Sequence, residues 1–337
     1  MGFLRRTKWQ AGVTLGLCLT LAHAAADARA QGAQSPPKKA QEAEAQRPIR
    51  VEVGLVSLLA TVRDGSRKLV ADLAKEDFRV VEDSVEQKVE YFSRETALPI
   101  TLGMLVDTSI SQQAVLGLEQ EAGARFLRRV LREKDLSFVI SFDVNVDLLS
   151  DLTPDTGQLE RALDRARINS PSAAGPIERR GPLGTALYDA VYLACREKLA
   201  RESGRKALVI LTDGVDAGSK VTLEQALEIA QRSDTVIYVI GVADPQFYFR
   251  QGVGYGGEGV AKKLAEETGG RAIFVRGEKK LEEAFDEIAE ELRTQYTLGY
   301  YPSNHSRDGK FRRVKIEANR KGLKVLARKG YYAPKAN

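Results

Sequence analysis

Residues 100–111 read ITLGMLVDTSIS, an apolar run that ends in Asp107 and is followed by two closely spaced serines. A second apolar run, ALVIL at residues 207–211, leads into the triplet TDG at 212–214. Short runs that are apolar at nearly every position are typical of strands buried on both faces of a parallel sheet. Because ligands bind at the carboxyl ends of such strands, the polar residues that end the two runs are candidates for one shared site.

The rest of the central region alternates between strand-like and helix-like segments. Patterns of buried strands recur at 100–106, 136–142, 144–149, 206–211, 235–242 and 271–275. Amphipathic patterns with helical spacing lie between them, at 112–132, 156–167, 187–200, 223–232, 260–267 and 279–294. This alternation predicts an α/β fold with a mostly parallel central sheet and helices on both of its faces.

Small β segments are predicted on both sides of this region. Residues 50–97 contain short strand-like stretches, and so does the basic segment 295–337. Within the second segment, 311–318 and 323–328 are predicted to form a hairpin around the turn at 320–322. Neither segment has enough apolar surface to fold alone, and chain ends commonly lie close together. We therefore expect the two segments to pair with each other.

The first 49 residues are predicted to lie outside the folded region. Residues 1–30 combine early basic residues, an apolar run and small-x-small cleavage sites, which is the pattern of a secretory signal peptide. An uncleaved membrane anchor is the alternative, since the apolar run approaches membrane-spanning length. Residues 31–49, rich in Ala, Gln, Pro and Lys, are predicted to be a flexible linker. We therefore expect an exported protein, periplasmic or secreted, that contacts a membrane only if the signal segment stays attached.

The composition of this 337-residue chain limits the kinds of disulfide, metal site and catalytic site that it can form. Its only cysteines are Cys18 and Cys195, and its only histidines are His23 and His305. Because Cys18 and His23 lie in the signal segment, the mature chain would keep one residue of each type. That excludes an intramolecular disulfide and a cysteine-based zinc site, and it leaves almost no room for histidine-based catalysis.

The net charge of the chain, +5 overall, is concentrated at its two ends. Residues 305–337 hold eleven Lys or Arg against Asp308 and Glu317, whereas residues 31–304 carry a net charge of −7. An acidic body argues against nucleic-acid binding by the main domain. The basic end has two interpretations: the solvated face of a half-buried sheet, or a contact for an anionic partner such as cell-surface polysaccharide at the envelope.

Oxygen-bearing side chains are predicted to meet at the carboxyl edge of the central sheet: Asp107, Ser109, Ser111, Thr185 and Asp213. Two carboxylates, three hydroxyls and waters form an all-oxygen shell that suits a hard cation such as Mg²⁺, with Mn²⁺ as the alternative. The two carboxylates roughly balance the charge of a divalent ion. An open coordination position would then attract a carboxylate from a partner.

The same residues resemble the metal-ion-dependent adhesion site (MIDAS) of the von Willebrand factor type A (VWA) domain. That motif consists of Asp-x-Ser-x-Ser, matched at 107–111, a distant Thr, matched at Thr185, and a distant Asp, matched at Asp213. The resemblance covers about residues 98–294. It implies a Rossmann-like VWA domain that binds a protein ligand through Mg²⁺ and is not an enzyme.

The flanking segments resemble one particular subfamily of VWA proteins. The motif around 73–78 and the end RKGYY at 328–332 look like an exported bacterial subfamily best known from Acidobacteria. The resemblance also implies that the partner offers an acidic side chain to the metal.

Three other functions are compatible with parts of the sequence. Asp107 and Ser109 suggest a Mg²⁺-dependent phosphohydrolase, but Ser109 stands where that chemistry needs a second Asp as general acid. An envelope assembly protein with a vestigial metal site is the second alternative. The third, dinucleotide binding by the GxGxxG match at 252–257, fails because the motif does not directly follow a strand. Asp143 is predicted to be a loop residue with which nothing pairs, and Asp216 a solvated turn residue.

Overall fold

The computed structural model describes residues 54–95, 98–168, 184–242, 247, 249, 250 and 256–336. The predicted signal segment 1–30 and linker 31–49, and most of the glycine-rich motif at 252–257, lie outside the described residues. The described residues all belong to one compact unit, 51–337. None of the helices within them is both long enough and apolar enough to cross a membrane.

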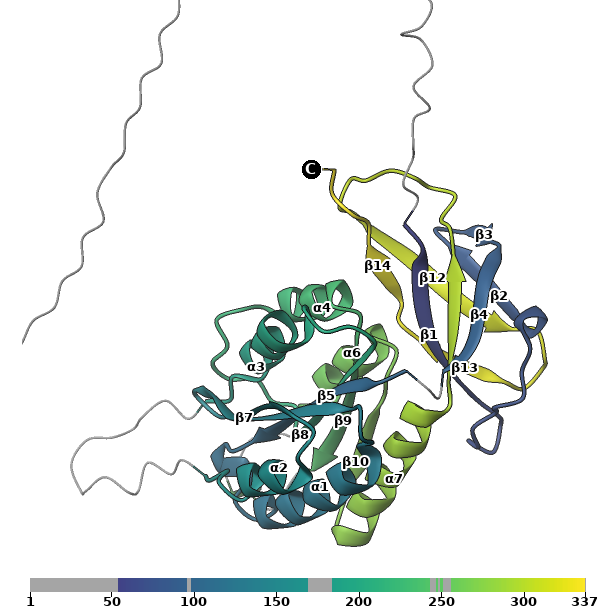
Figure 1. Ribbon diagram of the computed structural model, residues 1–337. Coiled ribbons are helices and arrows are strands. Elements are labelled where there is room, and N and C mark those ends of the chain that lie inside the picture. Colours follow the sequence, from purple (N-terminus) through teal and green to yellow (C-terminus); the bar gives the residue numbers. More distant parts are fainter. Residues whose placement is uncertain are drawn as a thin grey trace, which may run out of the picture. The chain divides into compact units, whose positions relative to one another are not determined.

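A six-stranded sheet with the strand order β10-β9-β8-β5-β6-β7 forms the centre of the α/β part (Figure 1). Its strands are β5 (Ile100–Asp107), β6 (Leu136–Phe142), β7 (Val146–Thr153), β8 (Arg205–Thr212), β9 (Thr235–Val242) and β10 (Ala272–Val275). Five strands are parallel, and β7 pairs antiparallel with β6 at one edge. Every residue of β5 and β9 is buried, as expected for apolar runs in the middle of a covered sheet. The predicted α/β fold with a mostly parallel sheet is confirmed.

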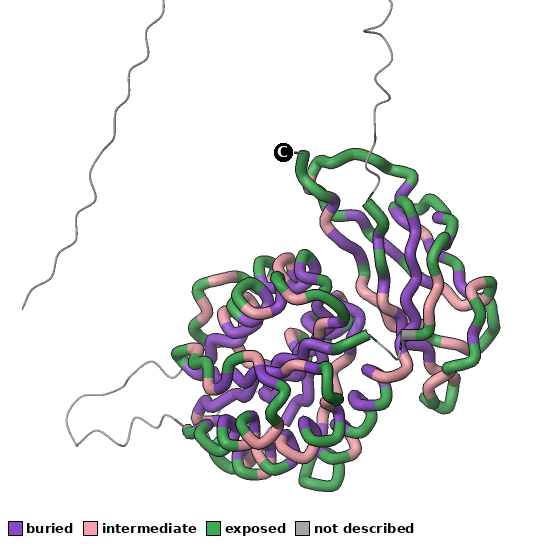
Figure 2. The backbone as a smooth tube through the Cα atoms, viewed as in Figure 1, coloured by how far each residue is buried: buried purple, intermediate pink, exposed green. Residues whose placement is uncertain are grey.

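Helices cover both faces of this sheet. One face carries α1 (Leu116–Val130), α2 (Thr156–Leu163) and α7 (Glu278–Arg293), and the other carries α3 (Leu187–Leu193), α4 (Leu223–Arg232) and α6 (Glu258–Glu267). Each group of helices buries its apolar side chains in a separate cluster against the sheet. Figure 2 shows the same division, with buried strands between helices whose outer surfaces are exposed.

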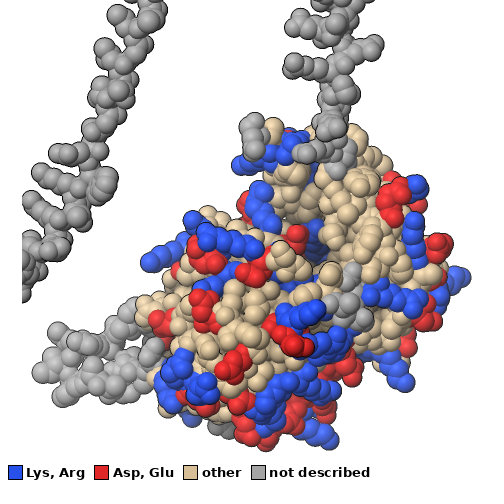
Figure 3. Space-filling view, viewed as in Figure 1, with Lys and Arg blue, Asp and Glu red and all other residues tan. Residues whose placement is uncertain are grey.

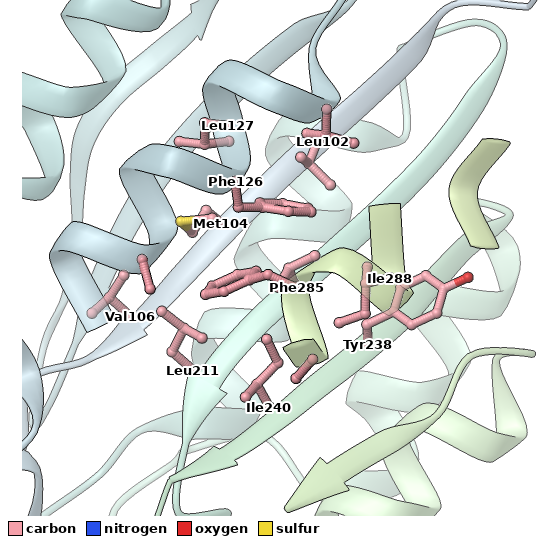
Figure 4. Close-up of a cluster of buried hydrophobic side chains, with 14 of the residues drawn as sticks. Leu102, Met104, Val106, Phe126, Leu127, Leu211, Tyr238, Ile240, Phe285 and Ile288 are labelled. Carbon is pink, nitrogen blue, oxygen red and sulfur yellow. The ribbon is translucent and has the colours of Figure 1, made fainter. Parts of the chain in front are cut away.

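The first of these clusters fixes the position of β5 and of its polar end. Figure 4 shows Leu102, Met104 and Val106 of β5 pointing toward side chains of α1 and α7. Phe126 of α1 and Phe285 of α7 stack there with ring centroids 4.8 Å apart. Because this packing locks β5 in the centre of the sheet, Asp107 at its end is held on a rigid base.

Strands from the two ends of the chain form two antiparallel four-stranded sheets, ordered β13-β1-β11-β4 and β14-β12-β2-β3. The N-terminal strands are β1 (Val56–Arg63), β2 (Phe78–Glu82), β3 (Val85–Gln87) and β4 (Val89–Glu95). The C-terminal strands are β11 (Gln295–Tyr300), β12 (Phe311–Ala318), β13 (Lys324–Ala327) and β14 (Gly330–Tyr332). Each sheet mixes strands from both ends, and the two sheets share one hydrophobic cluster. The expected pairing of the flanking segments is confirmed.

The predicted hairpin of 311–318 with 323–328 is wrong. β12 pairs with β2 and β14, whereas β13 pairs with β1 in the other sheet. The connection between β12 and β13 is tied to Asp77, whose carboxylate accepts from the Arg320 side chain at 2.9 Å and 3.0 Å. Alternating apolar residues in two successive strands fit two facing sheets as well as one hairpin, so the sequence pattern alone could not separate them.

Leu58→Ala is expected to destabilise both chain ends together. Leu58 of β1 is fully buried in the shared cluster, and truncation of such a side chain lowers the free energy of unfolding by about 2–5 kcal/mol. Hydrogen exchange should show faster exchange in β11 and β13, the neighbours of β1. Val85→Ala is the control, because Val85 is 53% exposed. Exchange that accelerated in β1 alone would contradict a jointly folded β part.

Candidate metal site

The site lies where the strand order of the central sheet changes direction. From β5 the chain continues to β6 on one side, and it later returns to β8 on the other side of β5. In the register of β5 and β8, Val106 is paired with Leu211, so the residues after both positions emerge side by side. Open α/β sheets bind ligands in the crevice at such a switch point, because the loops diverge there.

Asp107 organises the loop that carries the two serines. Its Oδ1 accepts a hydrogen bond from the backbone N–H of Ser109 at 2.9 Å, and its Oδ2 accepts one from Thr212 Oγ1 at 2.6 Å. The hydroxyl oxygens of Ser109 and Ser111 lie 3.1 Å apart, at the beginning of a short 3₁₀ turn over Ile110–Gln112. All three predicted residues of this loop are buried.

Asp213 is held beside Asp107 by a loop that depends on glycine. Its carboxylate accepts from the backbone N–H of Val215 at 3.0 Å, and the Asp213 side chain is buried. The next residue, Gly214, has a φ of +83°, and a Cβ there would lie 2.5 Å from the carbonyl oxygen of Gly257. Only glycine fits both conditions. Gly214 therefore allows the loop at 212–214 to pack closely against the beginning of α6.

Thr185 lies on the segment that leads into α3, between the loops that follow β6 and β8. Its carbonyl oxygen accepts from the N–H of Ala217 at 3.0 Å, and the N–H of Ala186 donates to the carbonyl oxygen of Asp143 at 2.5 Å. Thr185 is 6% exposed. The structure therefore places all five predicted metal-binding residues, buried, at the carboxyl edge of the sheet, with Asp107 at the end of β5 and the other four in the segments beyond the strands.

Two aspartates in these loops have larger roles than the sequence indicated. Asp143, expected to be an ordinary loop residue, is buried, and its Oδ2 lies 3.5 Å from Thr108 Oγ1. Asp216, expected to be a solvated turn residue, accepts from Ser219 Oγ at 2.5 Å and from the N–H of Tyr188 at 3.2 Å. Asp143 does lie in a loop, but the expectation that nothing pairs with it is wrong, and so is the expectation that Asp216 is merely solvated. Thr108 and Tyr188 are distant in sequence from these aspartates and meet them only in the folded loops.

Burial, and next the negative charge of Asp213, raise the pKa of Asp107 to about 7. The two carboxylates repel each other in a site shielded from water, and a divalent cation between them would remove this repulsion. Among the described residues, no group of three or more His, Cys, Asp and Glu side chains is arranged to hold a metal. A cation at this edge would therefore complete its shell with serine and threonine hydroxyls and waters, which fits the oxygen preference of Mg²⁺.

Two buried residues that follow the serine loop were not identified from the sequence. Glu119 of α1 and Gln112 of the 3₁₀ turn are both 0% exposed. None of their side-chain oxygen and nitrogen atoms has a hydrogen-bond partner among the described residues. A sequence signal for Glu119 exists, since it shares the helix face of Leu116, Ala122 and Phe126, all of which are buried.

The comparisons with known proteins give structural neighbours only. No family model matches the sequence, and no curated protein matches it. Solved structures similar to the chain include VWA-domain proteins. The von Willebrand factor type A protein from Catenulispora acidiphila is 14% identical, covers 84% of this chain and 74% of its own, and has a TM-score of 0.46.

Two further neighbours come from bacteria. The conserved hypothetical protein BatB from Bacteroides thetaiotaomicron is 19% identical, covers 58% of this chain and 99% of its own, and has a TM-score of 0.45. The vWF domain of the type V pili tip protein Mfa5 from Porphyromonas gingivalis is 16% identical, covers 58% of this chain and 95% of its own, and has a TM-score of 0.42.

Proposed function

We propose that this protein is an exported bacterial binding protein that holds a protein ligand through a divalent cation, Mg²⁺ or Mn²⁺. The residues that would hold the ion are Asp107, Ser109, Ser111, Thr185 and Asp213. The observation that carries the proposal is the burial of Asp107 and Asp213 together, beside two hydroxyl oxygens 3.1 Å apart, with the pKa of Asp107 raised to about 7. A divalent cation converts this unfavourable pair into a stable site.

A bound cation supplies one chemical capability, which is an open position for an oxygen ligand from another molecule. The chain itself holds the two carboxylates on adjacent strands and orients the serine hydroxyls by the hydrogen bond from Ser109 to Asp107. The preferred partner is a protein that offers an Asp or Glu side chain, because a carboxylate replaces a metal-bound water with a charged ligand. We propose binding rather than catalysis, since Ser109 stands where a phosphohydrolase would carry its general acid.

The proposed location, outside the cytoplasm, rests on the signal pattern of residues 1–30. The basic C-terminal segment offers a second, weaker contact for an anionic envelope surface. In β12, Arg313 and Lys315 are exposed while Val314 and Ile316 are buried. On the face drawn in Figure 3, basic and acidic side chains are interspersed rather than separated.

Not all of this basic segment is free for such a contact. Arg312 is buried and bonds to Asp308 at 2.8 Å, and Arg328 pairs with Asp234. The basic side chains that stay exposed are Arg307, Lys310, Arg313, Lys315, Arg320, Lys321, Lys324, Lys329 and Lys335. Of these, Lys315 is already ion-paired with Glu317, and Arg320 with Asp77.

Capture of a partner from an envelope fraction is expected to require both the metal and Asp107. The immobilised protein should retain a partner in Mg²⁺, release it in a chelator, and retain none when Asp107→Asn replaces the wild type. Retention that is unchanged by chelator would contradict the proposal. Hydrolysis of a phosphate monoester by the wild type, lost in Asp107→Asn, would instead favour the phosphohydrolase, and Mg²⁺-independent retention would favour the assembly protein.

A further inference from the structure

Glu119 is a buried carboxyl group that nothing in its surroundings explains. It lies in the first turn of α1, is 0% exposed, and neither of its oxygens has a hydrogen-bond partner among the described residues. Buried carboxyl groups are almost always paired or hydrogen-bonded, because water otherwise stabilises them far better. The orphaned amide of Gln112 is a second group of this kind, directly after Ser111.

The surroundings of Glu119 connect it to the candidate metal site. Burial, and next the negative charges of Asp107 and Asp213, raise the pKa of Glu119 well above its usual value. The charges of both aspartates therefore act on the Glu119 carboxyl group. The three acidic groups nevertheless do not form a cluster in metal-binding geometry. The backbone gives the same connection, because the N–H of Glu119 donates to the carbonyl oxygen of Val115 at 3.0 Å, and the N–H of Val115 donates to that of Gln112, the residue after Ser111, at 3.0 Å.

We propose that Glu119 is a positioning residue of the metal site, which accepts a hydrogen bond from a water molecule bound to the ion. This inference rests on the proposed function and adds a residue to it. Mg²⁺ keeps several waters in its shell, and a metal-bound water is a strong donor that needs a fixed acceptor. The unpartnered carboxyl group of Glu119, in the first turn of α1, would be such an acceptor, and the unpartnered Gln112 amide would be available to the same water network.

The competing explanation is that Glu119 is a neutral acid that merely fills space under α1. Glu119→Gln separates the two, because it keeps the size of the side chain and removes the charge. If Glu119 positions a metal-bound water, the variant should bind Mg²⁺ about 10–100-fold more weakly, the usual effect of losing a group that orients the metal shell. Its metal-free melting temperature should stay equal or rise, since a poorly solvated acid has been removed.

Calorimetric titration of Mg²⁺ into the full chain, together with melting curves with and without Mg²⁺, tests this. Glu121→Gln is the matched control, because Glu121 lies on the same helix with its side chain 67% exposed. Equal Mg²⁺ affinity in Glu119→Gln and wild type would overturn the role of Glu119 alone. Absence of Mg²⁺ binding to the wild type would overturn the proposed function.

Infrared difference spectra of the wild type keep the inference testable if the variant fails to fold. Glutamate labelled with ¹³C at its side-chain carboxyl group shifts the Glu bands away from those of Asp107. Addition of Mg²⁺ should convert one labelled, protonated carboxyl band into a carboxylate band. A spectrum in which no labelled carboxyl band changes would overturn the inference.

Discussion

Asp107→Asn is expected to weaken Mg²⁺ binding by more than about 100-fold and to leave the metal-free protein at least as stable as the wild type. The substitution removes one of two charges that face the ion. A pair of unit charges 4 Å apart is worth about 4 kcal/mol at an effective dielectric constant of 20, which exceeds the free energy of a 100-fold change. Asparagine keeps the oxygen that accepts from Ser109 or Thr212, so the loop should survive.

The expected stability of the metal-free Asp107→Asn variant follows from the repulsion between the two buried aspartates in the wild type. In the metal-free protein, Asp107 is held next to Asp213 at a pKa of about 7, and a neutral side chain removes that repulsion. Calorimetry and melting curves measure both effects. Asp147→Asn is the matched control, since Asp147 is an exposed residue of β7 at the edge of the same sheet. Unchanged Mg²⁺ affinity in Asp107→Asn would exclude these residues as the metal site.

A helix or strand could be predicted from the sequence where its packing in the fold requires the same apolar pattern that the local sequence shows. The bounds of β9, Thr235–Val242, agree with the apolar run, because a strand covered on both faces needs apolar residues throughout. Element ends were less predictable. The helix expected from residue 112 begins at Leu116, since the preceding residues form the 3₁₀ turn that shapes the serine loop. The helix expected at 187–200 changes to a π-helix at Ala194–Leu199.

The candidate site also has residues that the sequence indicated and contacts that only the folded structure shows. The sequence alone indicated the five candidate metal-binding residues, because a short motif after a strand and a topological rule together place them at one edge. Thr212 as the donor to Asp107, and Asp143 beneath Thr108, depend on the lateral register of β5 with β8 and β6, which no local pattern contains. Glu119 was overlooked although it shares helical spacing with the apolar residues Leu116, Ala122 and Phe126, because α1 is rich in charged residues and a glutamate is usually exposed.

The stabilisation of the protein by Mg²⁺ is expected to be larger at pH 8 than at pH 5. The pKa of Asp107 is about 7 in the metal-free folded state, against an ordinary value of 3.8. Between these values the folded state binds more protons than the unfolded state, so metal-free stability falls as the pH rises from about 4 to about 7. Glu119, whose pKa is also raised, adds a slope of the same sign.

Mg²⁺ competes with these protons, so its affinity should rise over the same pH window in which metal-free stability falls. Melting temperatures measured with and without Mg²⁺ across this range test both trends. Asp107→Asn should flatten the metal-free slope and lose most of the Mg²⁺-induced shift at every pH. An equal Mg²⁺-induced shift at pH 5 and pH 8 in the wild type would mean that the ion does not bind where Asp107 is protonated. The cation would then bind elsewhere on the chain, and the two buried aspartates would be a structural pair that shares a proton.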